Sequence, residues 1–313
     1  MNMTLNSPWD YSALDQETKS LRKSQEYVTR FYFKEYLEFF SRKYGLQVHL
    51  NKNVYKIDWD KNCGFRIYLK DGDVVGCKML VNATGYFSNP IVPNYPGHKN
   101  VLHIHSSEYR DPNTLAARVG VSKRVLVIGK RITAEQIADE LYESGWDVSI
   151  SCRGKITYAK LTLATKIKNY IYLRLESFYL VINSEKKKNS FPPMTGKKIK
   201  KRIDNGDIPL YPCIECIEDK SVRFSNGESR EFDAVIYATG FNYSLQHMNI
   251  AFYEDKGSVH PSIMGNGVQS SVVPNLYFVG VDNQINFRSR YLRGIRKDAV
   301  TVAAHIQRNL LNR

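Results

Sequence analysis

Long apolar runs are missing from this chain of 313 residues, and cysteine is scarce. The N-terminus has no apolar core of the kind that a signal peptide needs, and no uncharged stretch approaches the roughly 20 residues of a membrane-spanning helix. The five cysteines are an odd number without a disulfide framework, which fits a reducing compartment. We therefore expect a cytoplasmic protein, long enough for two domains, with the ordinary globular content of 42% hydrophobic and 24% charged residues.

Glycine is absent from residues 1–28, a polar stretch in which Trp9 and Tyr11 are the candidate anchors to the rest of the protein. A glycine-rich turn that binds phosphate through its backbone cannot lie there.

Acidic residues are scarce between residues 155 and 202, where thirteen Lys or Arg stand against two Glu. This segment therefore carries an excess of eleven positive charges, out of +14 for the whole protein. Two interpretations stay open: a helical cover over a neighbouring domain with lysines that reach solvent, and peripheral contact with a membrane surface. Nucleic acid is disfavoured as a partner, because no recognised nucleic-acid-binding module accompanies the charge.

A strand–helix–strand pattern occupies residues 123–153. The apolar, β-branched run 125–128 breaks at Gly129, and the helical pattern that follows ends at Gly145, just before a second β-branched run. This order predicts a mononucleotide-binding unit with a pyrophosphate at the helix N-terminus, where free N–H groups and the helix dipole attract an anion. The alternative is a Rossmann-like unit without a ligand. The helix shows apolar residues at i, i+3, i+4 and i+7, namely Ala134, Ile137, Ala138 and Leu141.

The glycine fingerprint of dinucleotide-binding proteins, G-x-G-x-x-G/A, is incomplete in this unit. Gly129 and Ala134 fit its first and third positions, but the second position is Arg131. This arginine brings a long cation to the place where backbone normally approaches the pyrophosphate, so it either contacts a phosphate or obstructs the approach. We expect the contact, because a cation beside a pyrophosphate is electrostatically favourable. The candidate nucleotide-binding residues of this turn are Gly129, Lys130, Arg131, Thr133, Ala134 and Glu135.

No carboxylate follows the second strand of the unit. An acidic residue there would suit the ribose hydroxyls of NAD, whereas an arginine suits the 2′-phosphate of NADP. The strand runs into Cys152 and Arg153, so the sequence favours NADPH, with Arg153 as the candidate ligand of the 2′-phosphate. The alternative is that Arg153 is a solvated loop cation.

Two short motifs could carry metal or redox chemistry. His103 and His105 form an HxH pair, but no nearby carboxylate or third ligand accompanies them, so we expect no metal site. Cys213 and Cys216 form a CxxC in a strand-like context, away from the helix N-terminus that lowers a thiol pKa. A disulfide reductase therefore ranks below the functions considered next.

Elsewhere, hydrophobic periodicity and turn residues predict two further helices and several strands. The first helix begins near Thr29 and ends at Gly45, with Phe33, Leu37, Phe40 and Tyr44 on its apolar face; the last spans residues 291–310, with Ile295, Val302 and Ile306 as core. The expected strands are 47–50, 54–59, 65–69, 74–78, 79–83, 222–224, 234–238 and 276–280.

Two of these strands run into the same tripeptide, Ala83-Thr84-Gly85 and Ala238-Thr239-Gly240, and they bracket the nucleotide unit. This arrangement resembles the flavin-containing monooxygenases and their Baeyer–Villiger relatives, in which ATG turns mark the crossings between an FAD domain and an inserted NADPH domain. Residues 82–97 resemble the first crossing, and residues 105–109 resemble the second half of the family's identifying motif. In its first half, Lys99 and Val101 replace the expected aromatic residue and glycine.

The resemblance implies an α/β fold with two dinucleotide-binding, Rossmann-type domains. Residues 1–112 and 233–313 would form a discontinuous FAD-type domain, and residues 113–232 an inserted NADPH-binding domain that carries the basic insert 155–202. The two tripeptides, Ala83, Thr84, Gly85 and Ala238, Thr239, Gly240, would then contact the cofactors. The family's first strand and its FAD-binding glycine turn have no counterpart before Thr29, so we expect a truncated or divergent member that by itself binds FAD weakly or not at all.

The reaction implied by the resemblance is NADPH-dependent monooxygenation of a small N-, S- or carbonyl substrate by an FAD hydroperoxide. The cofactors would supply the chemistry, which agrees with the lack of a hydrolase triad or of paired carboxylates, and we assign no catalytic side chain. The alternative is a non-catalytic protein derived from the same fold, which binds NADP(H) or a membrane surface. The protein would be cytoplasmic in both cases, with membrane contact, where it occurs, through residues 155–202.

Overall fold

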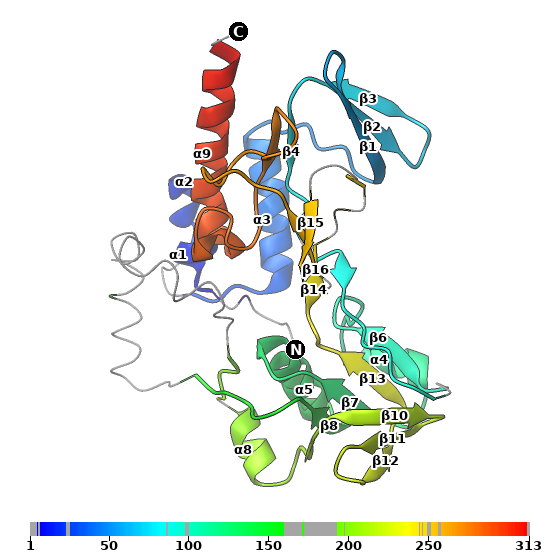
Figure 1. The fold of residues 1–313 in the computed structure, drawn as a ribbon. Coiled ribbons are helices and arrows are strands. Elements are labelled where there is room, and N and C mark those ends of the chain that lie inside the picture. Colours follow the sequence, from blue (N-terminus) through cyan, green and yellow to red (C-terminus); the bar gives the residue numbers. More distant parts are fainter. Residues whose placement is uncertain are drawn as a thin grey trace. The chain divides into compact units, whose positions relative to one another are not determined.

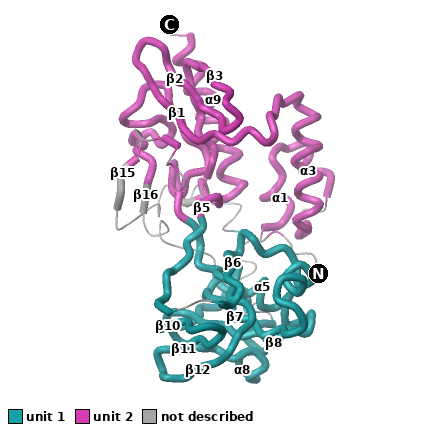
Figure 2. Tube along the Cα trace, turned by 90° about the vertical axis from the view of Figure 1, so that its right-hand side faces the viewer, with its two compact units in different colours: residues 1, 90–182, 189–241 teal, residues 2–89, 183–188, 242–313 magenta. Residues whose placement is uncertain are grey.

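The computed structural model describes residues 5–311 with the exception of residues 6, 23–25, 86, 98–99, 160–170, 172–192, 197, 244, 246, 249–251 and 256–257. These residues form two compact units (Figure 2). The described part of unit 1 lies within residues 90–241, and that of unit 2 within residues 5–89 and 242–311.

Unit 1 is built on a five-stranded sheet in which all neighbouring strands are parallel. Apart from the first residues of β7 and β8, its central strands are buried runs rich in Val and Ile, as expected where both faces of a parallel sheet are covered. The predicted strand–helix–strand pattern is confirmed, because α5 (Ile132–Glu143) joins two adjacent strands. The order across the sheet is β6 (Leu102–His105), β13 (Ala234–Tyr237), β7 (Arg124–Ile128), β8 (Asp147–Ser151) and β9 (Leu210–Tyr211).

A small antiparallel sheet packs against the parallel sheet of unit 1 (Figure 1). Its apolar side chains share one core cluster with Leu126, Val235 and Tyr237, and the ring of Phe224 stacks on that of Tyr211 with centroids 4.2 Å apart. The predicted CxxC lies here, with Cys216 buried inside a strand. The remaining elements of unit 1 are β10 (Ile214–Glu218), β11 (Ser221–Phe224), β12 (Ser229–Glu231), α4 (Pro112–Val119) and α8 (Ile199–Asp204).

Three helices open unit 2, namely α1 (Trp9–Ser12), α2 (Gln16–Lys19) and α3 (Arg30–Lys43). Trp9 is fully buried against α3 and so anchors α1, as expected. The predicted apolar face of α3 is partly wrong: Tyr36 is the buried residue, whereas Leu37 and Tyr44 are 43% and 47% exposed. The face of α3 with Tyr36 is buried because its ring packs edge-on against the ring of Trp9, with the ring centroids 4.8 Å apart.

The strands of unit 2 include an antiparallel meander and one short parallel pair. The predicted strand at residues 47–50 is wrong; these residues are exposed coil and turn, so no buried face favours a strand there. The meander is β1 (Val54–Asp60), β2 (Gly64–Leu69) and β3 (Val74–Cys77), and the parallel pair is β4 (Leu80–Asn82) with β17 (Leu276–Phe278). The other elements are β15 (Phe252–Asp255), β16 (Ser258–Pro261), η2 (Phe287–Arg290) and α9 (Leu292–Leu311), and β5 (Asn89–Pro90) pairs with β14 (Phe241–Asn242) where the chain passes between units.

The compact units divide the chain at residues 89/90 and 241/242, whereas the sequence placed the inserted domain at residues 113–232. The difference arises because β6 and β13 are strands of the sheet of unit 1. Most of the basic insert lies outside the described residues, and so do the predictions about it. None of the helices that the structure describes has the length and apolar content needed to cross a membrane.

Candidate nucleotide-binding site

The carboxyl ends of the five parallel strands meet along one edge of unit 1. The chain leaves β7 at Gly129, β13 at Ala238 and β8 at Cys152. In open parallel sheets, ligands bind outside the carboxyl ends of the strands, where loops and helix N-termini converge. This edge is therefore the candidate nucleotide-binding site, and it holds most of the residues that the sequence singled out.

Gly129 is tightly packed against its neighbours at this edge. A β-carbon built on it would lie 2.6 Å from the carbonyl oxygen of Ala238 and 3.1 Å from the β-carbons of both Ala134 and Ala238. Because the carbonyl belongs to the backbone of the neighbouring strand, it cannot swing away as a flexible side chain could. The first and third fingerprint positions and the second ATG tripeptide, which lie far apart in the sequence, are thus in direct contact.

The N-terminus of α5 opens on this edge. Arg131 is its N-cap residue, in an extended conformation, and its side chain makes no capping hydrogen bond to the helix. Thr133 in the first turn is exposed. The N–H groups of the first helical turn therefore carry their partial positive charge without a side-chain cap, which is the arrangement that binds phosphate.

Two cations lie in the turns that follow β7 and β8 at this edge. Lys130 donates a hydrogen bond from Nζ to the carbonyl oxygen of Arg153, 2.9 Å away, and so ties the turn after β7 to the loop after β8. Arg153 itself is exposed. The neighbouring Cys152 is buried, which raises the pKa of its thiol and keeps it uncharged near neutral pH.

Glu135 contacts protein backbone at the first turn of α5. Its Oε2 accepts a hydrogen bond from the N–H of Thr195 at 2.5 Å, and its Oε1 accepts from the Thr195 hydroxyl at 2.7 Å and from the N–H of Gly196 at 2.9 Å. The residue is only 3% exposed. Both carboxylate oxygens are therefore engaged within the protein, a contact that the sequence did not indicate.

His105 holds the second ATG tripeptide in place. Its Nε2 lies 3.0 Å from the carbonyl oxygen of Gly240, and since a carbonyl can only accept, Nε2 carries the proton and donates. Nδ1 is then the acceptor for the N–H of Ser107, 3.2 Å away. Burial lowers the pKa of His105 and favours this neutral form. Thr239 adds a hydrogen bond from its hydroxyl to the carbonyl oxygen of Ile91.

The other half of the HxH pair is also engaged: His103 Nδ1 lies 2.8 Å from the hydroxyl of Tyr237. Among the residues that the structure describes, no cluster of three or more potential metal ligands is found.

The first ATG tripeptide, residues 83–85, belongs to unit 2 and follows β4. The side-chain oxygen of Asn82 accepts hydrogen bonds from the N–H and the hydroxyl of Thr84, at 3.0 and 2.8 Å. Its amide nitrogen lies 3.3 Å from Nε2 of His247 and 2.8 Å from Sδ of Met248. Asn82 therefore shapes this turn, although sequence reasoning did not mark it as a site residue; its place directly before the tripeptide was the available signal.

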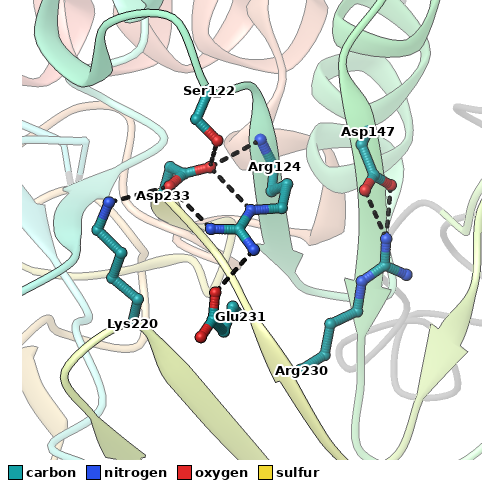
Figure 3. Close-up of polar contacts among 7 residues, drawn as sticks. All are labelled: Ser122, Arg124, Asp147, Lys220, Arg230, Glu231 and Asp233. Atoms are coloured by element: carbon teal, nitrogen blue, oxygen red, sulfur yellow. Dashed lines mark hydrogen bonds and ion pairs between the residues drawn. The ribbon is translucent and has the colours of Figure 1, made fainter.

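A charged cluster stabilises the opposite edge of the same sheet, at the amino ends of the strands (Figure 3). Asp233, whose side chain is 2% exposed, accepts hydrogen bonds from the hydroxyl of Ser122, the N–H and guanidinium of Arg124, and the ammonium of Lys220. Burial alone would raise the pKa of this carboxyl, but the hydrogen bonds outweigh burial and hold the pKa well below its usual range.

Comparison with known proteins defines the class. Residues 7–280 match the family described as pyridine nucleotide-disulphide oxidoreductase, and the chain belongs to this family. The flavin monooxygenase resemblance is confirmed, because the relatives and structural neighbours include flavin monooxygenases.

Two relatives show how far the similarity extends. The chain is 30% identical over 281 residues to an uncharacterized CzcO-like oxidoreductase from Geobacillus kaustophilus, covering 87% of this chain and 76% of the relative. It is 25% identical over 337 residues to the indole-3-pyruvate monooxygenase YUCCA4 from Oryza sativa, covering 91% of this chain and 72% of the relative.

Solved structures of low sequence identity share the fold. The flavin-containing monooxygenase from Stenotrophomonas maltophilia aligns with a TM-score of 0.72 at 19% identity, over 97% of this chain and 86% of that one. A cyclohexanone monooxygenase gives 0.71 at 16% identity, over 99% and 79%. A bacillithiol disulfide reductase from Bacillus cereus gives 0.69 at 20% identity, over 97% and 85%. The fold is therefore common to monooxygenases and disulfide reductases.

Proposed function

We propose that the carboxyl edge of unit 1 binds NADPH and that the protein is a divergent, NADPH-dependent member of the flavoprotein monooxygenases, acting in the cytoplasm on a small N-, S- or carbonyl substrate. The observation that carries the nucleotide site is the contact of Gly129 with Ala134 and Ala238 at the uncapped start of α5. A turn this tight brings backbone N–H groups to one point, which suits a pyrophosphate.

Different residues of the chain contact different parts of the nucleotide. The first turn of α5 and Arg131 face the pyrophosphate, Lys130 fixes the loop after β8, and Arg153 in that loop meets the 2′-phosphate. Bound NADPH supplies a hydride for the reduction of a flavin. The proposed contacts are Gly129, Lys130, Arg131, Thr133, Ala134, Arg153 and the tripeptide Ala238, Thr239, Gly240, with Glu135 acting from behind the first turn.

FAD fits the described residues of this chain less well. The tripeptide Ala83, Thr84, Gly85 after β4 and the helix α9 belong to unit 2. The described residues between 5 and 53 form helices, turns and coil, and residues 1–28 hold no glycine, so they supply no glycine-rich strand–helix turn for the FAD pyrophosphate. We therefore derive no step through the flavin, and a non-catalytic NADP(H)-binding protein is the second candidate.

Titration of NADPH and NADH against the wild type and Arg153→Ala tests the nucleotide site. A charge-assisted hydrogen bond contributes about 1.5–3 kcal/mol, so the variant should bind NADPH about 10- to 100-fold more weakly and NADH with unchanged affinity. The matched control is Lys155→Ala, which removes another exposed cation from the same loop and should change neither affinity. Equal weakening of both nucleotides by Arg153→Ala would contradict the assignment.

The positive charge of residues 155–202 supports one further proposal, peripheral contact with an anionic membrane surface. The protein should then sediment with vesicles that contain anionic lipid, but not with neutral vesicles, and should be released by salt. Equal sedimentation with both kinds of vesicle would argue against it.

A further inference from the structure

Three carboxylates follow one face of the nucleotide helix α5. Glu135, Asp139 and Glu143 are spaced at i, i+4 and i+8, which places them one above the other along the helix. We call them the acidic row. The row begins in the first helical turn, at the candidate nucleotide site, and ends in the last turn of the helix.

Each carboxylate of the acidic row binds a segment that lies far away in the sequence. Asp139 accepts a hydrogen bond from Nη1 of Arg202 at 2.5 Å, and Glu143 accepts from Nη2 of the same arginine at 2.9 Å. Glu143 also pairs with Nζ of Lys198 at 2.6 Å. At the other end of the row, Glu135 holds residues 195 and 196 as described above.

Glu135 differs from the other two members in what it binds. Asp139 and Glu143 pair with charged side chains, whereas Glu135, almost completely buried, accepts two backbone N–H groups and a hydroxyl. These three bonds fix the backbone itself beside the first turn of α5.

The fixed backbone is also held from its other side. Met194, fully buried, exchanges backbone hydrogen bonds with residues 157 and 159. Gly196 lies so close to Tyr158 that an added β-carbon would stand 2.8 Å from its ring. Residues 194–196 are thus clamped between Tyr158 and the start of the nucleotide helix.

We infer that Glu135 is a positioning residue for the nucleotide: it holds residues 194–196 against the first turn of α5, where they form a wall beside the pyrophosphate. This inference rests on the proposed nucleotide site. Without the Glu135 carboxylate, residues 194–196 are no longer held against the first turn of α5. The pyrophosphate and the nicotinamide half of NADPH then lose the contacts that these residues provide. The adenosine 2′-phosphate, bound at Arg153, keeps its own contact.

The test compares two ligands on Glu135→Gln. NADPH spans the whole site, whereas 2′-AMP carries the adenosine and its 2′-phosphate but neither phosphate of the pyrophosphate nor the nicotinamide half. The variant keeps the side-chain length but replaces one acceptor oxygen by an NH2 group that cannot accept a hydrogen bond. We expect about tenfold weaker binding of NADPH, the size of one lost hydrogen bond to a charged group, and less than a twofold change for 2′-AMP. The titrations are made at pH 8, where Asp139, whose pKa burial raises to about 6, is ionised.

Glu143→Gln is the matched control, because it removes a carboxylate from the far end of the acidic row. Both ligands should bind it as they bind the wild type. If Glu135→Gln fails to fold, Thr195→Val removes the hydroxyl bond to Oε1 and should weaken NADPH alone by two- to threefold. Equal weakening of both ligands by either variant would reduce Glu135 to a structural role and overturn the inference. A wild type that binds neither ligand would refute the proposed site and this role with it.

Discussion

Replacement of Asp233 by Asn is a direct test of what holds the sheet of unit 1 together. All the groups around this carboxylate are donors: a hydroxyl, a backbone N–H, a guanidinium and an ammonium. Asparagine has nearly the same shape, but it carries no charge and turns an NH2 group toward these donors. The substitution therefore removes the charge and one acceptor without creating a cavity.

The exposure of the two cations, Arg124 and Lys220, determines how much free energy of unfolding the Asp233→Asn substitution costs. Removing one partner of a fully buried ion pair costs about 3–5 kcal/mol, because the other charge stays behind without water. Here Arg124 and Lys220 are 34% and 51% exposed, so water can reach both, and Arg124 also keeps its pair with Glu231. The cost should thus approach that of lost hydrogen bonds to a charged group, about 2–3 kcal/mol. Glu231→Gln, which removes a 63% exposed partner, should cost less than about 1 kcal/mol.

Urea denaturation followed by tryptophan fluorescence measures this cost. Trp146 is buried in unit 1, whereas Trp9 and Trp59 lie in unit 2, so a variant with phenylalanine at positions 9 and 59 reports on unit 1 alone.

The stability that Asp233 contributes should depend on pH in a defined direction. The folded pKa of Asp233 lies below the unfolded value of about 3.9, so its stabilisation is complete above pH 5 and declines as the pH falls through 3.9 toward the folded pKa. The difference between wild type and Asp233→Asn should shrink in the same range. A cost below 1 kcal/mol, or a difference that stays constant from pH 6 to pH 3, would refute the reasoning.

Three further outcomes are expected. Arg131→Gly should weaken NADPH binding, and more strongly at low salt, where charge attraction is least screened; tighter binding would show that the arginine obstructs the site. Gly129→Ala should abolish NADPH binding and lower the free energy of unfolding by about 1–3 kcal/mol, because its β-carbon would meet the Ala238 carbonyl at 2.6 Å; an unchanged titration would contradict the crowding argument. Dialysis against excess FAD should leave a protein without flavin absorbance, since residues 1–28 offer no glycine turn, and stoichiometric retained flavin would speak against this.

Local patterns in the sequence predicted local structure well. The run at residues 125–128, the helical spacing after Ala134 and the stop at Gly145 each depend on neighbours within a few residues, and the strand, helix and turn follow them. The final helix was predicted for the same reason, with Val302 in its core.

Contacts between distant residues could not be predicted in this way. Nothing near residue 105 indicates that its imidazole donates to Gly240, and nothing near Glu135 indicates that residues 195 and 196 return to it. Parallel pairing has no local signal either, so the boundaries of unit 1 differ from those predicted. On α3, the helical periodicity of the apolar residues is compatible with two adjacent buried faces. The face with Tyr36 is buried because it packs against the buried Trp9, a contact between distant residues.

The position of β13 between β6 and β7 affects how the sheet of unit 1 can form during synthesis. On the ribosome, both outer neighbours emerge more than 100 residues before the strand that separates them. At about 5–20 residues per second, their backbone edges wait roughly 5–20 s without a partner, and strand edges in that state pair readily with other chains. During that interval the facing edges of β6 and β7 are therefore open to pairing with other chains, until the middle strand is made.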